Sequence, residues 1–327
     1  MSQDKRLLLI VNPNSGTVAK SRLLPSITSN LDHFRLKYDL VFTREAGHGH
    51  TLARQAVSEG YYGVLACGGD GTVNEIGSAV AGSSTALGII PCGSGNGLAR
   101  HLGIPVDVEE SIRILAEDHL IDADYATGNN TPFFCTCGMG FDAAVSQRAA
   151  GEKKRGLAMY LRNAATEFVN YSPNDYIIEC NGQELTQHAF IVAVCNASQY
   201  GNNAFIAPQA SITDGMLDVM VVRSRNVFEH AIVGMDMLTG MIGKNTMVDS
   251  FRTNHLKITR SEAGPVHFDG DSREMQAEIT IDCHPGAVKI FTTCQEQNFR
   301  PIVTPFQMLV RDVGLEIKHL FEKSTSQ

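Results

Sequence analysis

Three polar, glycine-containing loops, each directly after an apolar run, constrain the fold of this chain more than any other feature of its sequence. The loops are NPNSG (12–16), CGGDGT (67–72) and PCGSGNG (91–97), and the apolar runs before them are RLLLIV, YGVLA and TALGII. Helical patterns follow the loops, and apolar strands that alternate with helices are typical of a parallel sheet covered on both faces. Ligands of such sheets bind beyond the carboxyl ends of the strands. The three loops are therefore predicted to meet at one cleft.

In the second half of the chain the pattern changes to short strands separated by turns. Apolar runs such as YIIEC, FIVAVC, LDVMVV and EITIDC recur at the spacing of an antiparallel sandwich or barrel-like domain. Helical patterns at 157–171 and 227–240 interrupt them. The predicted fold class is α/β plus all-β, with a Rossmann-like parallel domain at 1–122 and a β-sandwich domain at 123–302. An amphipathic helix at 303–323 is predicted to pack back on the first domain.

Composition and charge narrow the class of protein. With 327 residues, 43% of them hydrophobic, the chain is long enough for two domains with sizeable cores. A formal net charge of −8 provides no general attraction for nucleic acid or for an anionic membrane. The eight cysteines are scattered without paired CxxC motifs, which predicts reduced thiols in a cytoplasmic protein. No apolar stretch approaches the roughly 18 residues of a membrane span, so a soluble or peripheral protein is expected.

The central loop combines three features that suit a phosphate group. Gly68, Gly69 and Gly71 have no Cβ atom and allow the backbone to approach a ligand closely. Thr72 is expected to cap the helix that follows, whose first N–H groups attract phosphate. Asp70 would then place a carboxylate beside the phosphates, where it can bind Mg²⁺ through water or polarise an acceptor hydroxyl. A plain turn is the alternative explanation.

The two flanking loops share this arrangement in weaker form. Asn12, Ser15 and the amide near Gly16 would supply further hydrogen-bond donors, although an ordinary Asn-Pro turn explains the same residues. GSGNGLAR (93–100) also leads from a strand into a helix. It lacks the Gly-Lys-Ser/Thr ending of a Walker loop and the spacing of a full GxGxxG fingerprint. A P-loop NTPase and an ordinary Rossmann dehydrogenase are therefore disfavoured.

Taken together, NPNSG, GGDGTVNE and PCGSGNGLARHLGIP resemble the catalytic domain of the diacylglycerol kinase and sphingosine kinase superfamily of lipid kinases. GMGFDAAV, VCNASQYGNNAFIAPQASITDGMLDVMVV and FDGD resemble downstream motifs of that family in the same order. The resemblance extends from Leu8 to about Ile290 and is closest to the compact bacterial lipid kinases. It implies a kinase that holds ATP and Mg²⁺ in a cleft between an α/β nucleotide-binding domain and a β-sandwich lipid-binding domain.

By position, the resemblance assigns the nucleotide and metal sites to these loops and to neighbouring strand ends. Asp70 would be catalytic and would bind the metal, and Asp122 would share the metal, with Asp124 as a nearby alternative. The implied nucleotide-binding residues are Asn12, Ser15, Gly16, Thr43, Gly68, Gly69, Gly71, Thr72, Glu75, Ser94 and Asn96.

The motif FDGD (268–271) would supply the second acidic pair. Taken without the resemblance, this motif predicts a hairpin turn, because Asp-Gly is a strong hairpin signal. In the family it returns two carboxylates to the cleft. Asp269 would be the base that accepts the proton of the lipid hydroxyl, and Asp271 would help to hold the nucleotide or Mg²⁺. The family usually has glutamate where Asp271 stands, so this carboxylate reaches less far.

Three further positions have both a family role and an ordinary one. Asp142 matches a position that contacts the lipid head group, whereas a turn or surface carboxylate between strands is the ordinary interpretation. Asp214 matches a structural metal ligand of some members, and a turn before a strand explains it equally well. Gly97 stands where many bacterial members have aspartate, so one acid of the metal network is missing at that position.

The predicted function is an ATP-dependent lipid kinase that phosphorylates diacylglycerol or a related lipid, as a cytoplasmic protein peripheral to the inner membrane face. A sphingoid base is an alternative acceptor because of GSGNG. The rivals are an NAD kinase-like enzyme and a non-catalytic nucleotide or lipid sensor. The basic run GEKKRG (151–156) is predicted to contact anionic lipid, with a solvated loop as its alternative. No nucleic-acid partner is expected, and homodimer formation is left open.

Overall fold

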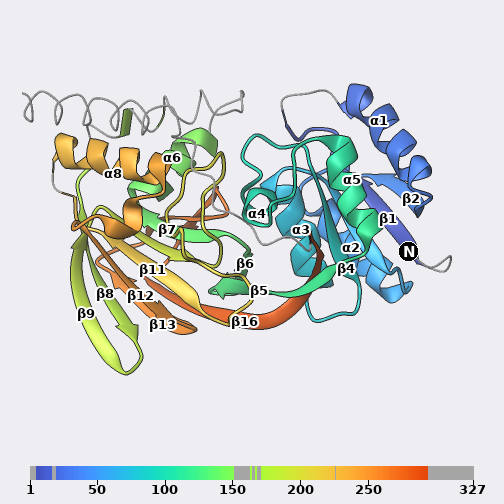
Figure 1. Ribbon diagram of the computed structural model, residues 1–327. Helices are drawn as coiled ribbons and strands as arrows, with labels where there is room; N and C mark the ends of the chain where they lie inside the picture. Colours follow the sequence, from blue (N-terminus) through green and yellow to red (C-terminus); the bar gives the residue numbers. More distant parts are fainter. Residues whose placement is uncertain are drawn as a thin grey trace, which may run out of the picture.

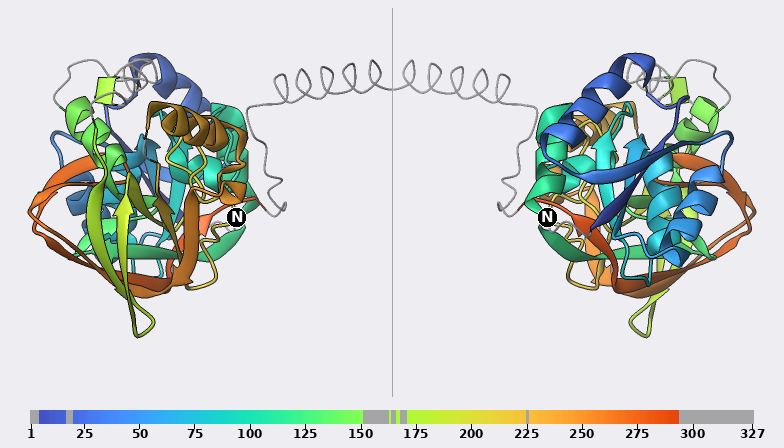
Figure 2. Two further views of the ribbon diagram at one scale, coloured as in Figure 1. Left: turned by 90° about the vertical axis from the view of Figure 1, so that its left-hand side faces the viewer. Right: turned by 90° about the vertical axis from the view of Figure 1, so that its right-hand side faces the viewer.

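The structure is a computed structural model and describes residues 5–16, 20–150, 163, 166–167, 171–224 and 226–293. Two halves lie side by side, and strands β5 (Leu120–Gly128) and β16 (Glu278–Phe291) run between them along the lower edge of Figure 1. In the C-terminal half, helices α6 (Phe141–Ala150) and α8 (Val227–Thr239) lie on the same side of the strands, as Figure 2 shows from a second direction.

The N-terminal half is a parallel sheet in the order β2-β1-β3-β4, with helices on both faces. The strands and helices of this half are β1 (Arg6–Val11), α1 (Lys20–His33), β2 (Lys37–Phe42), α2 (His48–Ser58), β3 (Gly63–Gly68), α3 (Asp70–Val80), β4 (Ala86–Pro91), α4 (Gly97–His101) and α5 (Val108–Glu117). Leu7 and Leu9 pack with α1 and α5 on one face, and Leu8 and Ile10 pack with α2 and α3 on the other. Burial on both faces explains why these strands are apolar at nearly every position.

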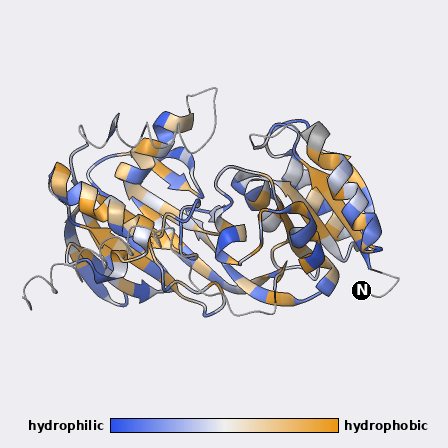
Figure 3. Cartoon of the chain, turned by 45° about the horizontal axis from the view of Figure 1, so that its top comes forward, coloured by the Kyte–Doolittle hydropathy of each residue, from blue (hydrophilic) through white to orange (hydrophobic). Residues whose placement is uncertain are grey.

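The C-terminal half contains two packed layers of mainly antiparallel strands. Its other elements are β6 (Thr131–Phe133), β7 (Thr136–Gly140), β8 (Asn174–Cys180), β9 (Gln183–Ala189), β10 (Ile191–Cys195), β11 (Leu217–Val222), η1 (Ile242–Lys244), β12 (Val248–Thr253), β13 (His255–Arg260), β14 (Gly264–Phe268) and β15 (Asp271–Met275). One sheet has the order β12-β11-β10-β7-β14-β15. Val192 and Val219 of this sheet pack against Ile258 and Ile281 of the other. Figure 3 shows hydrophobic residues along the strands of both halves.

Strand β16 joins the two halves into one continuous sheet. Its first part pairs with β13 in antiparallel fashion, and near its end Ile290 lies opposite Leu87 of β4 in parallel. β5 accompanies it on the other side, with a shift of register between His284 and Val288. Phe291 is 0% exposed and belongs to the core of the N-terminal half. Backbone hydrogen bonds, and not only side-chain contacts, therefore connect the halves.

The predicted fold class, a parallel α/β half followed by an antiparallel β half, is confirmed. EITIDC, expected as a short strand of its own, instead lies in the longer strand β16, because β5 pairs with β16 on both sides of the register shift. The predicted helix at 303–323 and the basic run at 151–156 lie outside the described residues, as does most of the predicted helix at 157–171. No helix within the described ranges is long and apolar enough to cross a membrane.

Candidate active site

The three glycine-containing loops follow β1, β3 and β4, and the parallel order of these strands brings the loops together. The loops after β3 and β4 touch through their backbones. A Cβ atom on Gly93 would lie 2.5 Å from Cα of Gly69, and one on Gly95 would lie 2.8 Å from Oδ2 of Asp70. Glycine is therefore needed at these positions so that the loops can approach each other and enclose a carboxylate.

The glycines of the central loop differ in what they make room for. The sequence predicts that all three admit a ligand. In the structure, a Cβ atom on Gly68 would collide with the side chain of Thr72, and one on Gly69 would lie 3.2 Å from Cα of Gly93. These two glycines serve packing within the protein. Only Gly71 faces the C-terminal half, where a Cβ atom would lie 3.4 Å from Oδ2 of Asp271.

Asp70 is the residue on which the loops converge. It begins α3, and its carboxylate accepts hydrogen bonds from the backbone N–H groups of Asn96 (2.9 Å) and Gly97 (2.6 Å). Asn96 has a left-handed backbone conformation (φ 52°), which asparagine tolerates better than most residues. Burial raises the pKa of Asp70 to about 6; the N–H of Gly97 lowers it, and the charge of Asp269 raises it further. A carboxylate with this pKa is ionised at neutral pH and still able to accept a proton.

The loop after β1 is tied to the same place. Nδ2 of Asn12 donates a hydrogen bond to Oγ1 of Thr72 (3.0 Å). Thr72 does not cap α3 as the sequence predicts, because Gly69 occupies the N-cap position and no side chain forms a cap hydrogen bond there. Its hydroxyl instead receives the amide of Asn12. The hydroxyl of Ser15 donates to the backbone oxygen of Asn12 (3.0 Å), and Thr43 lies buried at the end of the neighbouring strand.

Three other predicted nucleotide-site residues lie within the loops themselves. Gly16 has φ 79°, a conformation that favours glycine. Ser94 is exposed in the loop after β4. The side chain of Asn96 accepts the N–H of Gly93 and donates to its carbonyl oxygen, both at 2.9 Å, so it fixes the shape of its own loop.

Helix α3 also carries two side chains that fix its neighbours. The carboxylate of Glu75 accepts the N–H groups of two glycines at the start of α2 (2.8 and 3.0 Å); its contact with a nucleotide stays a prediction. Asn74 donates to the carbonyl oxygen of Pro132 and to Oδ2 of Asp269, both at 2.9 Å. Asn74 was not predicted as a site residue, although it lies inside the motif GGDGTVNE. It connects the central loop to the C-terminal half.

The turn Asp269–Gly270 brings the second acidic motif to the first. It joins β14 to β15, and both residues have positive φ (51° and 87°), as a two-residue hairpin turn of this kind requires. The carboxylate of Asp269 accepts four hydrogen bonds of 2.7 to 3.0 Å, from the backbone N–H groups of residues 134–136 and from the side chain of Asn74. The hairpin is thereby attached to both halves.

These four bonds decide what Asp269 can do in this arrangement. An ionised carboxylate offers about four acceptor positions, and four donors already occupy them. Burial raises the pKa of Asp269, whereas the donors, Phe134 first among them, lower it. Asp269 therefore holds the hairpin in place and puts a negative charge near Asp70. Its assignment as the base that accepts the hydroxyl proton stays a prediction.

Asp271 completes the acidic group. It is the first residue of β15, and the position of its Oδ2 next to Gly71 places its carboxylate at the start of α3. The first turn of a helix has N–H groups without carbonyl partners and a partial positive charge, which favours anions. Asp70, Asp269 and Asp271 thus surround the first turns of α3.

Asp142 occupies a different setting from the one expected. The sequence places it in a loop between strands, but it lies in the first turn of α6 and is only 4% exposed. Its Oδ2 accepts the hydroxyl of Tyr200 (2.8 Å) and lies 3.0 Å from Nε2 of His267. A turn or surface carboxylate, the ordinary interpretation, is therefore wrong. Contact with a lipid head group stays a prediction.

Two predicted metal ligands lie outside the Asp70 group. Asp122 on β5 is exposed and forms an ion pair with Lys289 of β16 (2.7 Å). Asp214 forms an ion pair with Arg252. The carboxylate of Asp124, the alternative to Asp122, is buried and accepts the N–H groups of two glycines in neighbouring turns, both at 2.7 Å. Within the described residues, His, Cys, Asp and Glu side chains form no group of three or more that could hold a metal ion.

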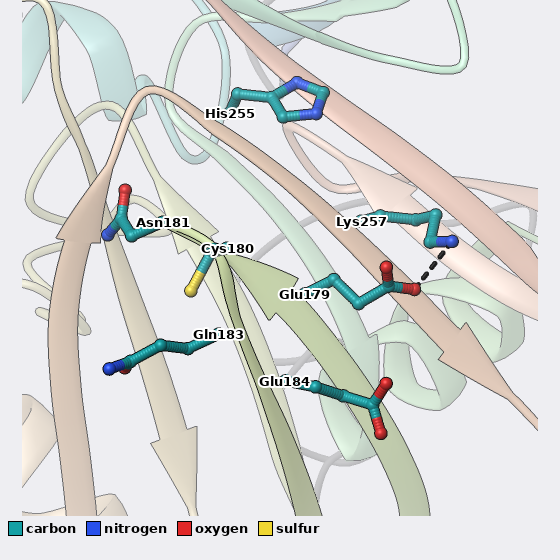
Figure 4. Close-up of a pocket in the computed structure, with 8 residues that line it drawn as sticks. Glu179, Cys180, Asn181, Gln183, Glu184, His255 and Lys257 are labelled. Atoms are coloured by element: carbon teal, nitrogen blue, oxygen red, sulfur yellow. Dashed lines mark ion pairs between the residues drawn. The ribbon is translucent and has the colours of Figure 1, made fainter.

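Among the hollows of the described surface, two differ in their relation to the predicted site. One, of about 390 Å³, adjoins the acidic group. Its walls come from α2, α3, β5, β6, β15 and the β5–β6 connection, and include Asn74, Glu75, Tyr125 and Arg273. The other, of about 510 Å³, lies at the β8–β9 hairpin and is drawn in Figure 4, where Lys257 pairs with Glu179. Because the second contains none of the predicted site residues, only the first belongs to the candidate active site.

Known proteins with similar sequences match both halves of the chain. The family described as "Diacylglycerol kinase catalytic domain" matches residues 6–127, and the one described as "YegS C-terminal NAD kinase beta sandwich-like domain" matches residues 135–292. A protein of Chromohalobacter salexigens named "Probable lipid kinase YegS-like" is 31% identical over 235 residues, which cover 70% of this chain and 76% of the relative. The chain belongs to the diacylglycerol kinase family of lipid kinases. The resemblance drawn from the motifs is thereby confirmed.

Further proteins similar to this lipid kinase are named diacylglycerol kinases. The diacylglycerol kinase of Bacillus subtilis is 27% identical over 277 residues, which cover 82% of this chain and 90% of the relative. The crystal structure of a diacylglycerol kinase from Bacillus anthracis matches with a TM-score of 0.70 at 21% identity, and covers 90% of this chain and 99% of that one. At this level of identity the second match supports the fold alone.

The contact between the two glycine loops generates a first prediction. Gly93→Ala would place a Cβ atom 2.5 Å from Cα of Gly69, so the loops must separate and the N–H groups that hold Asp70 must move. We expect the free energy of unfolding to fall by about 1–3 kcal/mol and phosphoryl transfer to fall at least about tenfold. Denaturant unfolding and a kinase assay measure the two effects. The matched control is Gly234→Ala in α8, where nothing lies within 4 Å of the added atom. Equal behaviour of the two variants would contradict the packing argument.

The raised pKa of Asp70 generates a second prediction. Because the native state binds this proton more tightly than the unfolded chain (about 3.9, against about 6 when folded), the contribution of Asp70 to stability falls as pH rises through that interval. Denaturant unfolding of the native protein and of Asp70→Asn, compared from about pH 4 to pH 7, should show the native protein losing up to about 3 kcal/mol relative to the variant. A difference that does not change with pH would mean that Asp70 has an ordinary pKa.

Proposed function

We propose that this lipid kinase transfers the γ-phosphate of ATP to the hydroxyl group of diacylglycerol or a related lipid at a membrane surface. The observation that carries the proposal is Asp70, a carboxylate at the first turn of α3, held by the loop after β4 and raised in pKa by burial. Phosphoryl transfer depends mainly on positioning and charge neutralisation, so a weak base that orients the hydroxyl is sufficient.

We assign that orienting role to Asp70 and not to Asp269. Asp70 accepts one N–H on each oxygen from the loop after β4, which leaves acceptor positions for a hydroxyl donor or for water. Asp269 has its four positions filled by the protein. The two residues then have different roles. Asp70 contacts the reacting groups, and Asp269 holds the hairpin that faces them.

The donor set also fits the Mg²⁺ that the kinase family implies. Mg²⁺ usually binds through one or two carboxylates, with waters and substrate phosphates as its other ligands. Asp70 and Asp271 would supply those carboxylates, because both lie at the start of α3. When bound, the ion supplies neutralisation of the phosphate charge. Asp122 and Asp214 already pair with Lys289 and Arg252, so we do not assign them to the metal.

The membrane-surface part of the proposal is supported by α8. Nine large hydrophobic side chains of the described residues are exposed, and six of them lie between Val227 and Met241, which makes this segment the main apolar surface. Phe228 (84% exposed), Ile232 and Met235 follow each other on one face of the helix. The buried face of α8 packs on the same core as α6, which carries Asp142. Contact with a bilayer here would place the C-terminal half against the membrane that holds the acceptor.

The third prediction tests the activity itself. Labelled ATP, Mg²⁺ and mixed micelles that carry diacylglycerol, monoacylglycerol, sphingosine, ceramide, phosphatidylglycerol or undecaprenol, with NAD as a soluble acceptor, should yield labelled diacylglycerol or monoacylglycerol. Asp70→Ala should reduce the rate by at least about a hundredfold, because it removes the group that touches the reacting hydroxyl. Asp175→Ala on β8, an exposed carboxylate away from the cleft, is the matched control.

The same assay separates the rivals. Label on sphingosine would mean that the acceptor is a sphingoid base and not an acylglycerol. Label on NAD would overturn the proposal that the acceptor is a lipid. Binding of Mg·ATP without release of ADP in the presence of any acceptor would favour the sensor.

The fourth prediction concerns α8. Ile232→Glu places a charge on the exposed apolar face, so transfer to a long-chain acceptor in zwitterionic vesicles should fall about tenfold. Transfer to a short-chain acceptor dispersed in water should stay unchanged. Ile177→Glu on β8, at 37% exposure, is the matched control. Equal losses with both acceptors would show that α8 serves the fold and not the bilayer.

A further inference from the structure

A buried polar network lies directly behind the turn that carries Asp269. His267 is on β14, two residues before Asp269, and is 1% exposed. Its Nε2 lies 3.0 Å from Oδ2 of Asp142 on α6. A Cβ atom on Gly138 of β7 would collide with both groups, so the glycine opens the passage through which they meet. Such a contact between two buried polar side chains requires good geometry, because unsatisfied groups at this depth are costly.

Two hydrogen bonds indicate which ring nitrogen of His267 carries a hydrogen. The N–H of Gly270 donates to Nδ1 of His267 (3.4 Å), so Nδ1 carries no hydrogen. Nε2 of the ring is then the nitrogen that carries a hydrogen, and it donates it to Asp142. The imidazole thus connects α6 to Gly270, the second residue of the turn. It therefore helps to set the orientation of Asp269 on one side of Gly270 and Asp271 on the other.

Tyr200 extends the network to the other acidic motif. Its hydroxyl donates to Oδ2 of Asp142 (2.8 Å), and its ring meets that of His267 edge-on, with centroids 5.5 Å apart. Its backbone oxygen would lie 3.4 Å from a Cβ atom on Gly97, whose N–H binds Asp70. One chain of contacts therefore runs from the loop that holds Asp70, through Tyr200, Asp142 and His267, to the turn of Asp269.

We propose that His267, oriented by Asp142 and Tyr200, is a positioning residue for phosphoryl transfer that fixes the Asp269–Gly270 turn relative to Asp70. This inference rests on the proposed function. It gives Asp142 a role different from direct contact with the acceptor: its Oδ2 serves Tyr200 and His267, and its Oδ1 accepts the N–H of Ala143 (2.8 Å). With both oxygens engaged and the residue buried, Asp142 acts through the histidine.

His267→Gln tests the proposal. Glutamine keeps an N–H that can reach Asp142 but has no acceptor at the place of Nδ1, so the buried carboxylate stays paired while the turn loses its partner. We expect kcat to fall about tenfold with KM values for ATP and lipid within about twofold, because the reacting groups are misplaced after binding. Hydrogen exchange in the peptide 264–275 should become faster, with the thermal midpoint little changed. His188→Gln on β9, an exposed histidine, is the matched control.

Tyr200→Phe and Asp142→Asn distinguish the two roles of Asp142. If Asp142 positions His267, both variants lower kcat and leave the KM for lipid unchanged. A rise in the lipid KM with unchanged kcat in Asp142→Asn, together with wild-type kcat in His267→Gln, would overturn the proposal in favour of direct contact. Unchanged hydrogen exchange and unchanged kcat in His267→Gln would also overturn it. If the native protein phosphorylates no lipid, the proposed function fails, and the exchange experiment still decides whether His267 holds the turn.

Discussion

The hydrogen bonds from the loop after β4 to the carboxylate of Asp70 are the interaction on which the rest of the site depends. They connect the ends of two neighbouring parallel strands. They can form only because Gly69, Gly93 and Gly95 have no Cβ atoms, so the two loops and the carboxylate can approach one another. A charged group is normally placed where water can solvate it. Here two backbone N–H groups take the place of water, and the cost that remains appears as a raised pKa. Carboxylates with a pKa raised by burial occur mainly at functional sites, where charge develops or protons are transferred.

Asp70 and Asp269 are two partly buried carboxylates close together, and each needs its own hydrogen-bond donors to stay ionised. Asp269 accepts four hydrogen bonds and behaves as part of the framework, whereas Asp70 accepts one N–H of the loop after β4 on each oxygen. The negative charge of each raises the other's cost of ionisation, as the contribution of Asp269 to the pKa of Asp70 indicates. A cation or a metal-bound phosphate beside Asp70 would relieve that repulsion. The repulsion between the two carboxylates therefore favours a cation at this end of α3.

The sequence predicted the fold class and the meeting of the three loops, because apolar strands that alternate with helices leave few arrangements open. It also predicted that Asp70, Glu75 and the FDGD turn come together, through motifs in family order. It did not predict what the glycines make room for, since that depends on backbone contacts between loops. Asn74, Tyr200 and His267 were missed for a related reason: their partners are 195, 58 and 125 residues away in the chain, and no local pattern marks such pairs.

The position of β16 has a consequence for how the chain is made. The parallel sheet of the N-terminal half comes off the ribosome first, but the strand that covers its β4 edge, and the Phe291 ring that fills its core, lie near the other end of the described chain. Until that strand arrives, β4 presents an unpaired apolar edge next to an unfilled core. Such edges pair readily with other chains. The sheet and core of the N-terminal half can therefore be completed only after β16 has been synthesised, although the other strands of that half are made first.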